Sequence, residues 1–233
     1  MANDAADGTR WVEVSPGRLA GWLESFARDH GQIAVEPGPA VVTFRAADGT
    51  AAQCHVPFPP LRAPRAVPPE GTEPSESTVE PAAWAEEIRA HALGERTVAV
   101  LLVRLGGYAA GVFSGPGAQL AASKVGSRLV HGRSAAGGQS QQRFARRREK
   151  QASEALQAAA DTAAAVFGQF DGKLDAVVLG GDRRAVAGLR DDPRLRPYFK
   201  LATERFLTVP DPRLAVLRGT PRQFQAVRIR VTR

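Results

Sequence analysis

The second half of the chain alternates apolar runs with turn residues, a pattern typical of a sheet covered by helices. The apolar run at residues 97–105 predicts a buried strand, and Gly106-Gly107 turns it into a second strand at residues 108–115. A third strand is expected at residues 118–130, after another glycine-rich turn. Three strands in a meander, followed by alternating helices and strands, indicate an α/β domain with a mixed sheet.

A long helix is predicted at residues 141–167, because its apolar residues recur at spacings of three, four and seven. Beyond it we expect a buried strand at residues 174–182, a short helix at 183–192, a strand at 204–210 and a closing edge strand at 224–233. The apolar face of the long helix is formed by Ala152, Ala155, Leu156, Ala159, Ala163, Val166 and Phe167, and Gly168 ends it.

Residues 1–57 predict a small α/β unit of their own. A short strand at residues 10–14 precedes a helix that Ser15 caps and Gly31 ends, and a hairpin then turns at Asp48-Gly49. Segment 58–80 is rich in proline and glutamate, the composition of a linker, and a short helix follows at 81–94. The sequence thus predicts an N-terminal unit at 1–57, a linker at 58–80 and a main domain at 81–233.

Composition is that of a globular protein, with 43% hydrophobic and 24% charged residues among 233. No apolar run approaches the roughly 20 residues that span a bilayer, and the N-terminus lacks the features of a secretion signal. The single cysteine, Cys54, allows no internal disulfide. We therefore expect a cytoplasmic protein with no membrane partner.

The positive charge is concentrated in one segment. Between Ser123 and Lys150 eight cations face one acid, Glu149, so this window carries 8 − 1 = +7, the net charge of the whole chain. A surplus confined to one segment indicates a polyanionic partner such as nucleic acid. The cations are Lys124, Arg128, Arg133, Arg143, Arg146, Arg147, Arg148 and Lys150.

Gly137, Gly138 and Gln139 lie between the third strand and the long helix. A chain of this composition would contain the tripeptide by chance in about one case in ten, so its context carries the argument. With Ser140 as N-cap, the arginines fall in the first turns of the helix, where the dipole disfavours cations. Residues that oppose local stability usually serve function. The expected arrangement is a narrow, uncharged tip that is followed by a cationic helix.

These residues resemble the GGQ segment of peptide-chain release factors. The loop and the helix sequence SQQRFARRREKQ are similar to the Vms-like release factors, relatives of the middle domain of eukaryotic and archaeal release factors, and the Ala- and Arg-rich composition suggests their actinobacterial branch. The resemblance implies a mixed-sheet RNase H-like domain, preceded here by the small N-terminal α/β unit. It covers roughly residues 98–233 and leaves the region before the linker unexplained.

The activity that this resemblance implies is hydrolysis of the ester between a nascent peptide and tRNA. Gly137, Gly138 and Gln139 would be catalytic, and the eight cations would bind RNA. The implied partners are peptidyl-tRNA and the large ribosomal subunit with its RNA; we expect a monomer that uses no cofactor and no metal. Because no segment is an evident codon reader, rescue of stalled complexes is favoured over ordinary termination.

Two other functions stay open on the residues alone. A nuclease of this fold needs acids clustered around metal ions, but the predicted first strand contains Arg104 and no acid, while Asp175 and Asp182 only flank a later strand. Asp182 is more simply a helix cap. A non-catalytic RNA- or ribosome-binding factor needs the cations and not the tripeptide, so the intact Gly-Gly-Gln favours the enzyme.

Other catalytic patterns are weak. The histidines, His30, His55, His91 and His131, show no metal-ligand spacing, and no Gly-x-Ser-x-Gly sequence is present. Cys54 precedes His55, but adjacent strand residues point to opposite faces, so we expect a buried cysteine. The glycines of LGGD, residues 179–182, fit either a phosphate loop or a tight turn.

Overall fold

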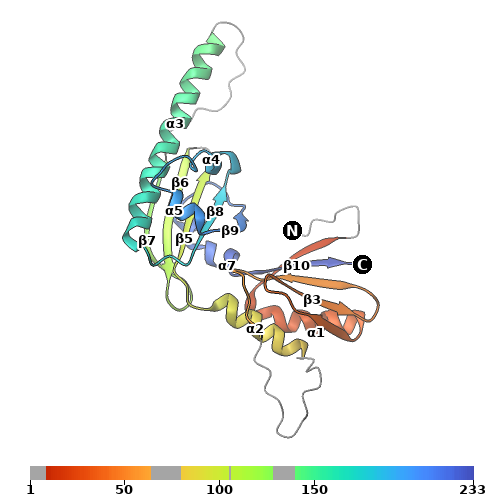
Figure 1. Cartoon of the computed structure of the whole chain (residues 1–233). Coiled ribbons are helices and arrows are strands. Elements are labelled where there is room, and N and C mark those ends of the chain that lie inside the picture. The colour runs from red at the N-terminus through yellow and green to blue at the C-terminus, as the bar shows by residue number, and fades with distance from the viewer. Residues whose placement is uncertain (1–8, 64–79, 105, 128–139) are drawn as a thin grey trace. The chain divides into compact units, whose positions relative to one another are not determined.

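The computed structural model describes residues 9–63, 80–104, 106–127 and 140–233, without the side chains of 140–148. The chain forms two compact units (Figure 1). Unit 1 comprises Met1–Gly94 together with Gln225–Arg233, and unit 2 comprises Glu95–Phe224.

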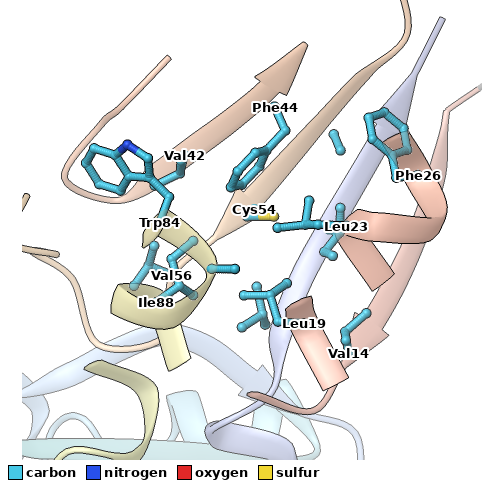
Figure 2. Packing of buried hydrophobic residues seen from close by; sticks show 14 of the residues in the cluster. Val14, Leu19, Leu23, Phe26, Val42, Phe44, Cys54, Val56, Trp84 and Ile88 are labelled. Carbon is cyan, nitrogen blue, oxygen red and sulfur yellow. The ribbon is translucent and has the colours of Figure 1, made fainter. Parts of the chain in front are cut away.

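Unit 1 is a five-stranded antiparallel sheet in the order β1-β10-β4-β3-β2. Its helical layer supplies core residues such as Leu19, Leu23 and Ile88, which pack with Phe44 and Cys54 of the sheet (Figure 2). The strands are β1 (Arg10–Val14), β2 (Ile33–Glu36), β3 (Val41–Ala46), β4 (Ala51–His55) and β10 (Val227–Thr232); the helices are η1 (Pro16–Arg18), α1 (Leu19–His30) and α2 (Pro81–Leu93).

The C-terminal strand is not where the sequence analysis places it. We expected residues 224–233 to form an edge of the main domain, but β10 lies between β1 and β4 in unit 1, antiparallel to both. Val227 and Ile229 are fully buried there. The alternation of apolar residues with arginines specifies a half-buried strand but does not say which strands will flank it.

Helix α2 also belongs to unit 1, although we assigned residues 81–94 to the main domain. Its buried side chains Trp84, Ala85 and Ile88 join the same core as Val42 and Val56 (Figure 2). The N-terminal unit is therefore completed by two segments from outside residues 1–57.

Unit 2 contains a mixed sheet in the order β7-β6-β5-β8-β9. The meander β5-β6-β7 is antiparallel, and β8 and β9 continue the sheet parallel to β5. The strands are β5 (Val98–Arg104), β6 (Gly107–Ser114), β7 (Gln119–Ser127), β8 (Ala176–Gly181) and β9 (Ala202–Leu207). This agrees with the mixed-sheet, RNase H-like domain that the resemblance implies.

The helices of unit 2 are one long helix and several short ones. They are α3 (Ser140–Phe167), η2 (Gly168–Phe170), α4 (Arg183–Ala187), α5 (Arg196–Lys200), α6 (Leu214–Arg218) and α7 (Thr220–Phe224). Asp182 caps α4 as predicted, since its carboxylate accepts from the backbone N–H groups of Arg184 at 2.7 Å and Ala185 at 3.2 Å.

The glycines that end β8 are explained by close packing. A Cβ on Gly180 would lie 2.8 Å from the carbonyl oxygen of Leu207, and one on Gly181 would collide with the carbonyl oxygen of Val103. Gly181 also has a φ of +101°, which favours glycine. The strand-to-helix turn thus accounts for LGGD without a phosphate.

Candidate nucleic-acid interface

In the sequence, the predicted catalytic segment lies between strand β7 and helix α3. Strand β7 ends at Ser127, and α3 begins with Ser140, the expected N-cap, so the helix starts one residue earlier than predicted. Between them, Gly137, Gly138 and Gln139 lie outside the described residues, as do Arg128 and Arg133. What the structure does define is how the two flanking elements are held.

The C-terminal half of α3, residues 155–167, is fixed to the sheet; we call it the anchored half. It packs against β5, β6 and β7, where Ala110 and Val112 of β6 belong to the same core. Small side chains let the helix approach the strands closely. Its buried residues are Ala155, Ala159, Ala160, Thr162, Ala163, Val166 and Phe167.

An ion-pair network tethers the anchored half. The guanidinium of Arg194 lies 2.9 Å from Asp161 of α3 and 2.7 Å from Asp192. The hydrogen bonds from Arg194 lower the pKa of both carboxyl groups below the ordinary value. The ring of Phe167 also meets Tyr198 edge to face, with centroids 5.3 Å apart. The packed end of the helix therefore has a defined position on the sheet.

The N-terminal half, residues 140–154, extends past the sheet and is called the projecting half (Figure 1). From Ser140 to Ala155, the first residue of the buried set, there are 155 − 140 = 15 steps, or about 22 Å of helix. Glu149 and Lys150, whose side chains are described, are exposed. All five predicted cations of α3, at positions 143, 146, 147, 148 and 150, lie in this half.

Helical spacing places most of these positions on one side. At about 100° per residue, positions 143, 147 and 150 fall roughly opposite Ala163, whereas position 148 falls on the same side as Ala163. Lys150 is 79% exposed and lies 3.9 Å from Glu154 in a loose i,i+4 pair. By spacing, positions 143, 147 and 150 thus form a row along α3 on the side opposite the packed stripe.

Strand β7 adds one cation on the helix-covered face. Lys124 is exposed and pairs in register with Ala110, which belongs to the core beneath α3, so both side chains emerge on that face. Two positions further, Gly126 lies under Tyr108, and a Cβ on Gly126 would stand 2.5 Å from the tyrosine hydroxyl. This close contact fixes the end of β7, which precedes the predicted catalytic segment in the chain.

The acids near β8 do not form a two-carboxylate site. Asp175 precedes the strand and accepts a 2.7 Å hydrogen bond from the backbone N–H of Thr97, while Asp182 follows the strand and caps α4. They are separated by the length of a six-residue strand, about 20 Å. Arg104 donates to the carbonyl oxygen of Val209 at 2.9 Å, a structural role. Both carboxylates are engaged by backbone groups.

The cysteine is a core residue, as expected. Cys54 is fully buried in unit 1, and burial raises the pKa of its thiol to about 12. Its neighbour His55 emerges on the opposite face of the sheet, with its ring 5.1 Å from that of Trp11. Cys54 and His55 therefore point to opposite faces of the sheet.

The described part of unit 2 thus combines a mixed sheet with a long helix that continues past the sheet. The model of the Actinobacteria/chloroflexi VLRF1 release factor family matches residues 96–230. The chain belongs to this family, so its class of function is that of a release factor acting on the ribosome.

Two solved structures resemble the fold of this chain. An archaeal translation termination factor, aRF1, is 13% identical, with a TM-score of 0.42 over 95% of this chain and 68% of that one. The Vms1 mitochondrial localization core is 12% identical, with a TM-score of 0.40 over 82% and 76%. No curated protein matches the chain in sequence. Within the described residues, no helix has the length and apolar character to cross a membrane.

Proposed function

We propose that this release factor hydrolyses the ester bond of peptidyl-tRNA on stalled ribosomes or large subunits. The observation that carries the proposal is the projecting half of α3. It directly follows Gly137-Gly138-Gln139 in the chain and holds five cations beyond the sheet. A helix of this length can carry a short segment into a crowded RNA site while the anchored half stays on the domain.

The chemistry requires water, an ester and a stabilised oxyanion. Water attacks the carbonyl carbon of the peptidyl ester, the bond to the tRNA 3′ oxygen breaks, and the proton from water ends on the leaving hydroxyl. The backbone N–H of Gln139 stabilises the developing negative charge, and its side-chain amide positions the water. Gly137 and Gly138 let the backbone approach the ester closely.

The cations hold the RNA. Arg143, Arg147 and Lys150 share one side of α3 by spacing and would contact consecutive phosphates of tRNA or ribosomal RNA. Binding should therefore weaken steeply with salt, since each neutralised phosphate releases counterions. The row does not select a base sequence, which suits a factor that meets many tRNAs.

The deciding experiment follows release of labelled peptide from ribosome-bound peptidyl-tRNA. Gln139→Ala should abolish release above the uncatalysed rate while ribosome co-sedimentation is retained. Gln142→Ala is the matched control, because it removes the same amide three positions away. Release by Gln139→Ala at the wild-type rate would contradict the catalytic role of Gln139. Release by the wild type no faster than the uncatalysed rate would leave a non-catalytic ribosome-binding factor.

A second experiment addresses the ribosomal state. We expect the protein to co-sediment with isolated large subunits carrying peptidyl-tRNA, because no part of the chain is an evident codon reader. Binding confined to whole ribosomes with a stop codon would refute the rescue role.

A further inference from the structure

The sheet of unit 1 has one face covered by helices and another that carries polar and aromatic side chains. Val227 and Ile229 point into the core beneath α1 and α2, so the alternate residues of each strand point the other way. We call this second side the open face and define it by Trp11, Arg228, Arg230, Gln53, His55 and Thr43. Arg228 is exposed and the other five are half-buried.

The strand register aligns these side chains in a row. Trp11 pairs with Arg230, Arg230 with Gln53, and Gln53 with Thr43, so four strands present an aromatic ring, a guanidinium, an amide and a hydroxyl side by side. At about 4.8 Å between strands, the row is about 14 Å long. The adjacent row contains Arg228 paired with His55.

Trp11 contributes to this face rather than to the core. It is absent from the buried cluster of unit 1, which includes Trp84 and packs Trp22 at its border. The guanidinium of Arg228 lies 4.5 Å from the Trp11 ring centroid, and the His55 ring is 5.1 Å away at a tilt of 49°. Two half-buried rings and an exposed guanidinium are therefore grouped on the open face.

The charges of the open face are arranged for an anion. Of the interior strands, β10 places Arg228 and Arg230 on this face and the adjacent β4 carries no acid, whereas the acids of this face, Glu13 and Glu36, are in the edge strands β1 and β2. Glu13 lies 4.0 Å from Arg228, and Glu36 binds Arg45 at 2.8 Å. The centre of the face thus keeps a positive surplus beside the rings.

We propose that the open face binds a segment of single-stranded RNA. Bases would stack on Trp11 and His55, the two arginines would contact phosphates, and Gln53 and Thr43 would hydrogen-bond base edges. An antiparallel sheet with such rings accommodates two or three nucleotides. An acidic protein would use the arginines but gain little from the rings, so RNA fits the whole set better. This site is in unit 1, separate in the sequence from the GGQ segment.

The test uses the full chain with Arg146, Arg147 and Arg148 changed to Glu, which reverses three of the five cations of α3. A fluorescein-labelled single strand of about twelve uridines is titrated and its anisotropy is measured. We expect binding to persist and to weaken at least about tenfold when Arg228→Glu and Arg230→Glu are added. The matched control, Arg18→Glu with Arg28→Glu, reverses two exposed charges of the helical layer and should change binding less than about twofold.

The rings are tested by fluorescence in the same background. Bound RNA should quench Trp11, and Trp11→Phe should lose that quenching while it keeps the affinity, because a phenyl ring still stacks. Trp11→Leu should weaken binding about tenfold. Circular dichroism of each variant checks that unit 1 remains folded. A loss of affinity in a folded variant then comes from the changed side chain of the open face.

Three results would overturn the inference: no RNA binding in this background, equal weakening by the control pair, or displacement of the RNA by polyglutamate as readily as by unlabelled RNA. Failure of Gln139-dependent peptide release would overturn the proposed function and leave this inference standing. Failure of the RNA titration would overturn this inference and leave the proposed function standing.

Discussion

Along helix α3, residues 155–167 turn small apolar side chains toward β6, whereas residues 140–154 continue the same helix past the sheet with arginines and lysine. The anchored half is stabilised by tertiary burial, which is what usually maintains a helix in water. The described side chains of the projecting half are exposed apart from the half-buried Gln151, and this half carries cations toward the positive end of the helix dipole. The contrast indicates that one half serves the fold and the other serves a ligand.

The largest expected effect is on stability, and it should differ between the two halves of α3 when an aspartate is introduced into each. Ala163→Asp would place an unpaired carboxylate in a fully buried position, at a cost of about 3–5 kcal/mol, and should unfold much of unit 2. Arg147→Asp in the projecting half introduces the same side chain and should leave the Tm nearly unchanged, since this half of the helix lies past the sheet. Thermal melting followed by circular dichroism measures both. Equal destabilisation would show that the projecting half is also packed.

The next largest effect is on ribosome binding, which substitutions in the projecting half should weaken without lowering stability. Changing Arg146, Arg147 and Arg148 to Glu should weaken ribosome association at least about a hundredfold at moderate salt, because several phosphate contacts become repulsive. The Tm should stay near that of the wild type. Co-sedimentation at two salt concentrations gives the affinity and its salt slope.

The control for that triple variant reverses Arg213, Arg218 and Arg222, three exposed arginines of the same unit. Their reversal changes the net charge equally and should affect association far less. Equal losses would mean that net charge, and not the projecting half, determines binding.

A smaller effect is expected where β7 ends. Gly126→Ala would force Tyr108 to move, at a cost of about 1–3 kcal/mol, and should lower the Tm. Tyr108→Ala in the same chain removes the obstructing ring, so the two substitutions should cost less together than the sum of their separate effects. Strict additivity in this double-mutant cycle would exclude the contact as the cause.

The smallest effect concerns the tether of the anchored half. Arg194→Gln should lower the stability of unit 2 slightly at neutral pH, because the pKa values of Asp161 and Asp192 are lowered in the folded state by Arg194. Such carboxyl groups contribute stability above their ordinary pKa of 3.8, and the contribution is lost as the pH falls through the lowered values. The gap between wild type and variant should therefore narrow below about pH 4. If the difference in stability between wild type and Arg194→Gln does not change with pH, the loss of stability comes from packing and not from the ion pairs.

Much of unit 2 could be predicted from the sequence, because its signals are local. The apolar run of β5, the glycine turn into β6 and the periodic alanines of α3 each specify an element within a short window. Short elements without such signals were missed, among them β2 and the five-residue helices α5 to α7. Charge counting likewise isolated the segment of eight cations before any geometry was known.

The sequence by itself determined where the cations, the tripeptide and the long helix lie along the chain, since these depend on composition and spacing. Only the tertiary structure decided that the helix leaves the sheet near Ala155 and that β10 completes the first sheet. It also brought Trp11, Arg230 and Gln53 into one row from three distant segments. The physical reason is that strand pairing joins residues far apart in the chain, and alternation of side chains specifies a face but not a neighbour.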